Sequence, residues 1–381
     1  MDIRIGERRR GAYRGRIIRL KAPSGQRLAE PGCPTALTCG GCALQFVRTA
    51  YQAETKNGWV RDALTPHLTA DVAFQGIIPD EVVTGSRRRV RWWQGSDDRG
   101  AFWGFHGRAS HDVMRHDDCM VATPNIRLLH RQLEEVPLPE VDSLQVTELA
   151  DGMHAVLDSG HPGSLPPLPE KVGEFPVQWW LRSGNEINPL HRPVHRLHEL
   201  LPAGGEWINL DVGPDDFIQA SRAGNEAMIR QVQVWSKGAR RVADMFSGFG
   251  NLSLPLAAAL KVSVVGAEVR AASVAAANHS ARSLGLDARY LQANLFEDFD
   301  LSPFTGMDML ILDPPRRGAS RICKVLPVLL PRKIVLISCD IASGARDAGM
   351  IARQGYHLEA VRVLDMFPFA GHVEAMSLWS L

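Results

Sequence analysis

The chain has 381 residues, with 43 Lys and Arg against 42 Asp and Glu, a formal net charge of +1 and 45% hydrophobic residues. This length allows two or three domains with full cores, and the hydrophobic content is typical of a globular protein. No stretch approaches the ~20 apolar residues that a membrane span requires, and charges interrupt the N-terminus where a signal peptide would be apolar. These features argue against a membrane or secreted protein, so we expect a cytoplasmic one.

The first 32 residues are strongly basic, with nine Lys and Arg residues against three acidic ones. A basic end of this kind favours a polyanionic partner. A solvated or disordered tail is the alternative interpretation. The basic residues are Arg4, Arg8, Arg9, Arg10, Arg14, Arg16, Arg19, Lys21 and Arg27.

Four of the six cysteines form a spaced group. Cys33, Cys39 and Cys42 are separated by five and two residues, and Cys119 follows later. In a cytoplasmic protein, cysteines are more often metal ligands or catalytic groups than disulfide partners. Four thiolates complete a tetrahedral zinc site or hold an iron–sulfur cluster, and the spacing does not choose between the two. Coincidental placement in an N-terminal loop is the remaining alternative.

The region after the first cysteines changes from a helical to a strand pattern. An apolar stripe predicts a helix from Ala43 to about Leu64. Residues 80–195 carry short alternating runs such as His154–Leu157 and Val177–Leu181, which predict antiparallel β-structure. The run Arg87–Trp93 combines basic and aromatic side chains, which can meet phosphates and stack on bases, so it is a candidate RNA contact. A strand with core aromatics at alternate positions is the competing interpretation.

From about Phe217 onwards, predicted helices and strands alternate to the end of the chain, which indicates a doubly wound, largely parallel sheet. The predicted elements are strand Val242–Phe246, strand Val262–Ala267, helix Ala271–Leu284, strand Arg289–Leu291, strand Met309–Leu312, strand Ile334–Ser338, and the last strands Ala360–Asp365 and Ala375–Trp379.

Chemically distinctive residues follow three of these strands. Gly248 and Gly250 follow the first strand, an Asp313-Pro-Pro turn follows a second, and Cys339 follows a third. Ligand sites of open parallel sheets lie at the carboxyl ends of the strands, and glycines let the backbone approach a ligand closely. We therefore expect these three strand ends to share one crevice. A buried, inert thiol is the alternative interpretation of Cys339.

The motifs occur together in a known order. They are FIQ at Phe217–Gln219, DMFSGFGN at Asp244–Asn251, DPPRRG at Asp313–Gly318, SCD at Ser338–Asp340 and FPFAGHVE at Phe367–Glu374. From Cys33 to the C-terminus the chain resembles the RNA 5-methyluridine methyltransferases, which methylate carbon 5 of a uracil with S-adenosylmethionine.

The resemblance implies an α/β fold: a C-terminal Rossmann-like class I methyltransferase sheet with a central α+β domain that carries a four-cysteine cluster site. It implies a basic N-terminal segment at 1–32, an iron–sulfur and RNA-recognition domain at 33–205 and a methyltransferase domain at 206–381. Thirty-two residues are few for the RNA-binding barrel (TRAM domain) that many members carry, so the chain resembles the ribosomal-RNA branch. We expect ribosomal rather than transfer RNA as substrate, and a monomer.

The resemblance also implies ligands. Cys33, Cys39, Cys42 and Cys119 match the family's 4Fe-4S ligands, which favours iron over zinc. Glu268 ends the second strand, where an acid accepts the ribose hydroxyls of the cofactor, and Asn294 follows the third strand, where it can bond adenine. The assignment of Gln219 to the cofactor site depends wholly on the resemblance. The expected cofactor-binding residues are Gln219, Phe246, Gly248, Gly250, Asn251, Glu268, Asn294 and Asp313.

The expected reaction requires a nucleophile and a base. Carbon 5 of uracil attacks a methyl group only after a nucleophile adds to carbon 6, and a thiolate with a lowered pKa suits that addition. The resemblance assigns this role to Cys339 and assigns removal of the carbon 5 proton to Glu374. The chain departs from the family at Asp340-Ile341, where Asn-Pro is usual.

Three other classes of protein share part of this pattern, and each would show a distinguishing feature. An RNA 5-methylcytidine methyltransferase would carry a Pro-Cys pair, and the sequence has none. A flavin or nicotinamide oxidoreductase with an iron–sulfur cluster would show the absorbance of its cofactor. A non-catalytic RNA-binding relative would bind RNA without transferring a methyl group.

Overall fold

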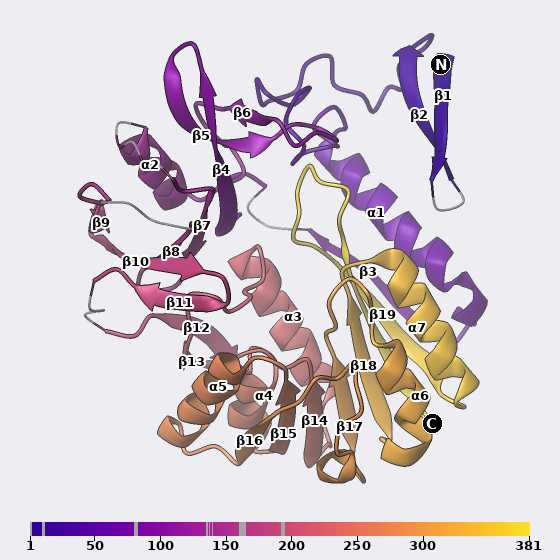
Figure 1. Ribbon diagram of the computed structural model, residues 1–381. Coiled ribbons are helices and arrows are strands. Elements are labelled where there is room, and N and C mark those ends of the chain that lie inside the picture. The colour runs from indigo at the N-terminus through magenta and orange to yellow at the C-terminus, as the bar shows by residue number, and fades with distance from the viewer. Residues whose placement is uncertain are drawn as a thin grey trace.

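The computed structural model describes residues 2–9, 12–79, 83–134, 136, 138, 140–159, 165–191 and 195–381 (Figure 1). Its C-terminal half is built on an eight-stranded sheet in the order β16-β15-β14-β17-β18-β20-β19-β3. The strands are β3 (Ala73–Pro79), β14 (Arg241–Met245), β15 (Ser263–Glu268), β16 (Ala288–Gln292), β17 (Met309–Leu312), β18 (Lys333–Ser338), β19 (His357–Asp365) and β20 (Glu374–Ser380).

The sheet is mixed rather than uniformly parallel. The strands from β16 to β18 run parallel, as the sequence predicted, but β20 is antiparallel to both β18 and β19. The short loop between β19 and β20 accounts for this reversal, because a parallel connection needs a crossover of a dozen or more residues. The three predicted strand ends, of β14, β17 and β18, therefore open at one edge of the sheet.

Helices cover both faces of this sheet and bury two separate hydrophobic cores, as expected of an α/β fold. One core lies under α3 (Arg222–Trp235), α4 (Ser253–Leu260) and α5 (Ala271–Ser283). The other lies under α1 (Thr49–Leu64), α6 (Ser320–Leu329) and α7 (Ile341–Arg353). Short 3-10 turns occur at Thr65–His67 and Ser302–Phe304.

The first helix begins later than predicted and belongs with the C-terminal sheet. α1 starts at Thr49 rather than Ala43, because the preceding segment bonds to other parts of the protein: the Leu44 N–H donates to the Phe369 carbonyl at 2.7 Å. Val60 and Leu64 of α1 lie in the second core, and β3 pairs in parallel with β19. The domain boundaries at 33–205 and 206–381 stay a prediction, although 49–79 packs on the C-terminal sheet.

The central region forms a second sheet in the order β11-β10-β8-β7-β4-β5-β6, with β9 paired to β10. Its pairs are antiparallel, as predicted, except that β8 and β10 run parallel. Helix α2 packs on this sheet over its own core. The elements are β4 (Arg89–Asp97), β5 (Gly100–His106), β6 (Val113–Arg115), α2 (Pro124–Leu133), β7 (Ser143–Glu148), β8 (Met153–Asp158), β9 (Lys171–Val172), β10 (Phe175–Ser183) and β11 (Glu186–Pro189).

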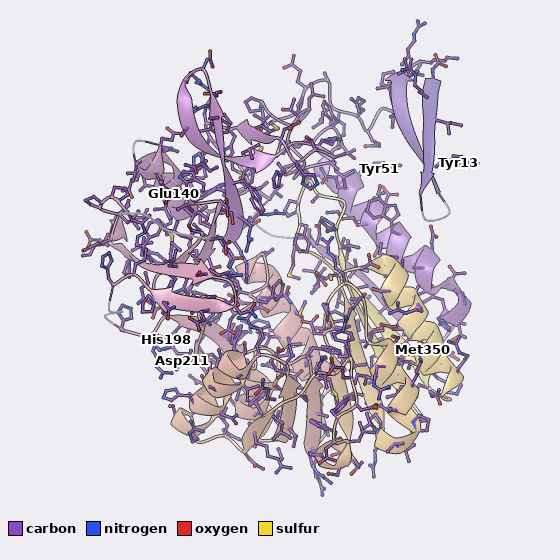
Figure 2. The ribbon with its side chains drawn as sticks, viewed as in Figure 1. Tyr13, Tyr51, Glu140, His198, Asp211 and Met350 are labelled. Carbon is purple, nitrogen blue, oxygen red and sulfur yellow. The ribbon has the colours of Figure 1, made fainter. Side chains whose placement is uncertain are left out.

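Two hairpins complete the fold. Hairpin β12 (His198–Ala203) with β13 (Glu206–Asp211) joins the central sheet to the C-terminal one, and His198 faces Asp211 across it at 3.3 Å (Figure 2). Asp211 also contacts His279 of α5 at 2.8 Å. Hairpin β1 (Asp2–Arg9) with β2 (Ala12–Arg19) stands apart from both sheets (Figure 1). Of the basic residues predicted to meet a polyanion, Arg10 lies outside the described residues.

Across the residues that the structure describes, no helix is both long and apolar enough to cross a membrane.

Candidate active site

The turn after β14 is a strained, glycine-dependent loop. Phe246, Gly248 and Gly250 have φ values of +68°, +53° and +87°. The Phe246 and Ser247 N–H groups both donate to the Ala267 carbonyl, at 3.0 and 3.1 Å, which holds the turn against β15. A Cβ added at Gly248 would meet only open space, so the backbone there is accessible to a ligand.

Glu268, at the end of β15, reaches back to this turn. One carboxylate oxygen accepts from the Gly248 N–H at 3.1 Å, and the other accepts from the Arg270 N–H at 3.0 Å. The acid expected to meet ribose hydroxyls therefore lies directly beside the glycine turn. Asn251, at the other end of the turn, exchanges two hydrogen bonds with Asn225 of α3, at 2.8 and 2.9 Å.

Two polar side-chain atoms at or next to this turn are buried without a hydrogen-bond partner among the described residues. Asp244 Oδ1 and Ser247 Oγ make no hydrogen bond among the described residues. The other Asp244 oxygen accepts from Ser253 at 2.5 Å, and burial raises the pKa of Asp244 to about 7. Buried polar atoms are normally satisfied, so this loop fits a polar ligand such as a methyl donor bound through its amino acid part.

Two further predicted residues approach the same edge from other parts of the chain. The Asn294 side chain accepts from the Phe296 N–H at 3.2 Å, and the Phe296 ring packs against Phe246 with ring centroids 5.3 Å apart. From the segment before α3, Gln219 Nε2 donates to Asp313 Oδ2 at 3.3 Å. All eight residues expected at the cofactor thus lie at or beside one strand-end edge, and their binding roles stay a prediction.

Asp313, Cys339 and Glu374 come together from β17, β18 and β20. Burial raises the pKa of Asp313 to about 7 and the pKa of Glu374 well above its usual value, and the Asp313 charge adds to the Glu374 rise. Burial also raises the pKa of Cys339 to about 11, and the charges of Glu374 and Asp313 contribute. The expected lowering of this thiol's pKa is therefore wrong for the free protein, because two carboxyl groups surround a desolvated sulfur.

Arg316 opposes this rise and was missed as a functional candidate. Its charge lowers the pKa of both Cys339 and Glu374, and its Nη2 lies 3.4 Å from His372 Nε2. The available signal was its position directly after the Asp313-Pro-Pro turn, since a residue there must share the edge of the sheet with the acid. Arg316 therefore supplies positive charge that acts on both the thiol and the carboxyl group.

The reactivity of Cys339 in the free protein should follow its raised pKa. Because a thiol with a pKa of about 11 is almost fully protonated at pH 7, its alkylation by iodoacetamide should speed up by about tenfold for each pH unit from 7 to 9. Mass spectrometry of the peptide that contains Cys339 measures this rate apart from the other cysteines. A plateau below pH 8 would show instead that the thiol has a low pKa.

The substitution of the usual Asn-Pro by Asp340-Ile341 preserves the start of the helix that follows Cys339. Asp340 is the N-cap of α7, and its carboxylate accepts from the Ser343 N–H at 2.8 Å. Asn caps helices equally well, and Ile341 occupies the first helical position, where Pro is also tolerated. Cys339 is therefore held at the start of α7 by ordinary capping chemistry despite the substitution.

The four predicted metal ligands are brought into one region. Burial raises the pKa of Cys42, and the thiols of Cys39 and Cys33 add to the rise. Cys42 in turn contributes to the raised pKa of Cys119, which burial brings to about 11. Among the residues with a described position, no group of three or more His, Cys, Asp or Glu side chains is arranged to hold a metal ion. The four thiols are therefore neighbours, but within the described residues they are not already arranged as a metal site.

The predicted RNA contact at Arg87–Trp93 is wrong for three of its seven residues. Val90 and Trp92 are buried in the core of the central sheet, and Arg88, directly before β4, is buried as well. Arg88 forms an ion pair with the buried Glu199 and donates from Nε to the Gln219 carbonyl at 2.9 Å. The competing interpretation, a strand with core aromatics at alternate positions, holds for Trp92 alone, because Val90 is aliphatic and Arg88 is a buried ion-pair partner. Arg88 therefore cannot meet an RNA phosphate.

Loss of Arg88 should therefore affect stability rather than RNA affinity. Arg88→Met leaves Glu199 buried without its counter-charge, which should lower the free energy of unfolding by about 3–5 kcal/mol. The control is Arg91→Met, which breaks the partly exposed pair with Asp158 (3.3 Å) and should cost less than about 1 kcal/mol. Urea denaturation measures both variants, and equal losses would contradict the buried role of Arg88.

Comparison with solved structures defines the class of fold. The chain superimposes on the Pyrococcus abyssi tRNA (uracil-54, C5)-methyltransferase, solved in complex with S-adenosyl-L-homocysteine, with a TM-score of 0.75 over 99% of this chain and 91% of that one. The two sequences are 22% identical, so the likeness establishes the fold: an α/β methyltransferase with a mixed sheet. No family model matches the chain.

Curated relatives define the family. A 23S rRNA (uracil(1939)-C(5))-methyltransferase RlmD of Pseudomonas aeruginosa is 35% identical over 404 aligned positions, which cover all of this chain and 86% of that relative. The enzyme of the same name from Edwardsiella ictaluri is 32% identical over 99% of this chain and 87% of its own length. The chain therefore belongs to the RNA uracil-C5 methyltransferase family, which confirms the resemblance found in the sequence.

Proposed function

We propose that this protein transfers a methyl group from S-adenosylmethionine to carbon 5 of a specific uridine in 23S ribosomal RNA. The single observation that carries the proposal is the convergence of Cys339, Asp313 and Glu374 at the strand-end edge that also holds the glycine turn. Relatives named as 23S rRNA methyltransferases at 30–35% identity favour ribosomal RNA over transfer RNA.

Cys339 carries out the first step of the proposed mechanism. Its thiol must first lose a proton, and Asp313 is suited to accept it because burial raises the Asp313 pKa to about 7. The thiolate then forms a bond to carbon 6 of the uracil, and the electrons of the carbon 5–carbon 6 double bond move into an enolate. Arg316, whose charge already acts on this thiol, stabilises the thiolate and the negative charge that develops next to it.

Glu374 completes the reaction. The bound sulfonium supplies the methyl group, which carbon 5 takes as the carbon–sulfur bond of the donor breaks. Glu374 then removes the proton from carbon 5, and the returning electron pair expels the Cys339 thiolate. A buried carboxylate with a raised pKa is a stronger base than an exposed one, so the burial of Glu374 suits this step.

A basic hollow beside the active site supports an RNA substrate. The hollow has a volume of about 420 Å³ and is lined by Phe296, Arg317, Ser320, Arg321 and Lys324. The Arg317 guanidinium lies 3.0 Å from the centre of the Phe296 ring, in a cation–π arrangement. Basic side chains around an aromatic ring can meet phosphates while a base stacks, which is how proteins hold unpaired RNA.

Methylation of defined RNAs tests the proposed substrate. Purified protein with radiolabelled S-adenosylmethionine should label a 23S rRNA transcript at one uridine and leave a tRNA transcript unlabelled. Digestion of the RNA and mass spectrometry of the fragments locate the methyl group. Labelling of the tRNA alone would favour the tRNA alternative, and RNA binding without labelling would favour the non-catalytic alternative.

We further propose that Cys33, Cys39, Cys42 and Cys119 hold a metal, a 4Fe-4S cluster by the family resemblance, with zinc as the alternative. The support is that two segments 77 residues apart, as counted from Cys42 to Cys119, bring the thiols together: Cys39 and Cys33 add to the raised pKa of Cys42, and Cys42 adds to that of Cys119. Thiolates are ligands for both metals, and a raised thiol pKa falls when a metal binds.

Purification without oxygen should distinguish the two metals. With a cluster, the protein should be brown, absorb broadly near ~400 nm and release iron together with acid-labile sulfide. Cys42→Ser should lose the colour, whereas Cys323→Ser, at a buried cysteine outside the group, should keep it. A colourless protein with one stoichiometric zinc would remove the iron assignment and leave the catalytic one intact.

A further inference from the structure

The loop between β19 and β20 carries the proposed base and has a strained conformation. It leaves β19 at Asp365 and returns at Glu374, which pairs with Leu364 across the two strands. At its centre Phe369 has a φ of +63°, in the left-handed region that non-glycine residues rarely adopt, and its side chain is 8% exposed. Such a conformation persists only where surrounding contacts enforce it.

Lys56 of α1 holds the start of this loop. Its Nζ donates to Asp365 Oδ1 at 2.7 Å and to the Phe367 carbonyl at 2.8 Å, and the Lys56 side chain is fully buried. The same Asp365 oxygen accepts from the Phe367 N–H at 3.2 Å. Burial lowers the pKa of Lys56, and Asp365 opposes that change, so the ammonium depends on this one carboxylate.

Gln52, one helical turn before Lys56, holds the centre of the loop. Its Oε1 accepts from the Phe369 N–H at 3.0 Å, while its Nε2 donates to the carbonyls of Leu44 and Val47 at 3.2 and 2.7 Å. Leu44 itself donates to the Phe369 carbonyl at 2.7 Å. Both backbone polar groups of Phe369 are thus fixed by the segment that runs from the cysteines into α1.

These two side chains are poorly explained by stability alone. Residues 52 and 56 lie on one face of α1, and both are buried polar groups in a place where apolar residues would pack without any desolvation cost. Their hydrogen bonds go to the loop before Glu374 or to the segment that bonds Phe369. Buried polar groups of this kind select one conformation among several packed alternatives.

We propose that Lys56 and Gln52 are positioning residues for proton removal by Glu374. They fix the loop in the strained form that brings the carboxylate to carbon 5 after methyl transfer. The inference rests on the proposed function, because it assigns the base step to Glu374. Cys339 stands at the end of β18 and start of α7, outside the loop, so its addition to carbon 6 does not depend on this anchoring.

The experiment separates these steps in the full-length protein. Lys56→Met keeps the length of the side chain and removes the two hydrogen bonds, and Gln52→Leu removes the contact to Phe369. On ordinary RNA transcript, both variants should accumulate a methylated protein–RNA adduct, because release slows by about 10- to 100-fold when a base is displaced by roughly 1 Å. On RNA containing 5-fluorouridine, the rate of adduct formation should match wild type.

Controls make each outcome decisive. Lys333→Met removes a partly exposed lysine of β18 that pairs with Glu359 of β19 at 3.7 Å, and this variant should release RNA at the wild-type rate. If Lys56→Met and Gln52→Leu lose adduct formation on 5-fluorouridine RNA as much as methylation, or release ordinary RNA normally, the positioning role is overturned. Glu374→Gln is measured in parallel. Normal release in that variant overturns the assignment of Glu374 as the base. Slow release in Glu374→Gln, with normal release in Lys56→Met and Gln52→Leu, overturns only the positioning role.

Discussion

Cys339→Ala should abolish both RNA methylation and the covalent protein–RNA complex. Without the sulfur, nothing adds to carbon 6, and carbon 5 stays too poor a nucleophile to attack the methyl donor. The expected loss is a factor of at least about 10⁴, since removal of a catalytic nucleophile leaves only binding and electrostatic effects. Incorporation of radiolabelled methyl groups into 23S rRNA measures the first effect, and denaturing gels measure the second.

The matched control for this variant is Cys323→Ala. Cys323 is also a cysteine of the C-terminal half, but it is buried in the core under α6 and lies away from the strand-end edge. Its truncation should cost some stability and leave the methylation rate per folded molecule unchanged. Residual methylation at a normal rate in Cys339→Ala would show that the covalent mechanism is wrong.

Glu374→Gln should slow the reaction after methyl transfer, at proton removal. The amide keeps the shape of the side chain but cannot accept the carbon 5 proton, so addition and methyl transfer proceed while release slows by roughly 10²–10⁴. A methylated adduct should then accumulate on ordinary RNA, visible as a slowly migrating radiolabelled band on a denaturing gel. Turnover at the wild-type rate would remove Glu374 from the mechanism.

RNA containing 5-fluorouridine gives an independent reference for that adduct. Fluorine at carbon 5 cannot leave as a proton does, so wild-type protein should form a trapped complex of the same mobility. Treatment with Cys339→Ala should give no such band. The pair of results distinguishes failure of the first step from failure of the last, which a methylation rate alone does not.

The strand-end site could be predicted because its signal is local. β17 and β18 are short apolar runs followed at once by Asp313 and Cys339, and β14 leads into Gly248 within three residues, so strand and site are read from the same few positions. The cofactor turn follows the same logic, since Gly248 and Gly250 adopt the positive φ values that glycine allows.

The raised pKa of Cys339 could not be predicted in the same way. It depends on burial of the sulfur and on carboxyl groups that arrive from β17 and β20, and no spacing in the chain states how closely these approach. The burial of Arg88 could not be predicted from the sequence either. An arginine among arginines indicates a basic surface, but Glu199, 111 residues away, makes it a core residue.

The edge of the C-terminal sheet was also beyond prediction from sequence. β3 contains Gly76 and has mostly half-buried side chains, so its pattern is weak, and its partner β19 lies near the other end of the chain. The reversal at β20 could not be predicted because the residues of Glu374–Ser380 do not indicate in which direction the strand runs. Long-range pairing decides both features.

The contact between Lys56 and Asp365 has a consequence for how the protein is made. The two residues are 309 positions apart. A ribosome that adds roughly 5–20 residues per second needs about 15–60 s to synthesise the intervening chain. During that interval Lys56 has no counter-ion, β3 has no neighbouring strand, and the apolar face of α1 has no complete sheet to cover. The nascent chain must therefore avoid aggregation while this sheet edge is unpaired. When β19 and β20 emerge, they complete the sheet and bring Glu374 into the site at the same time.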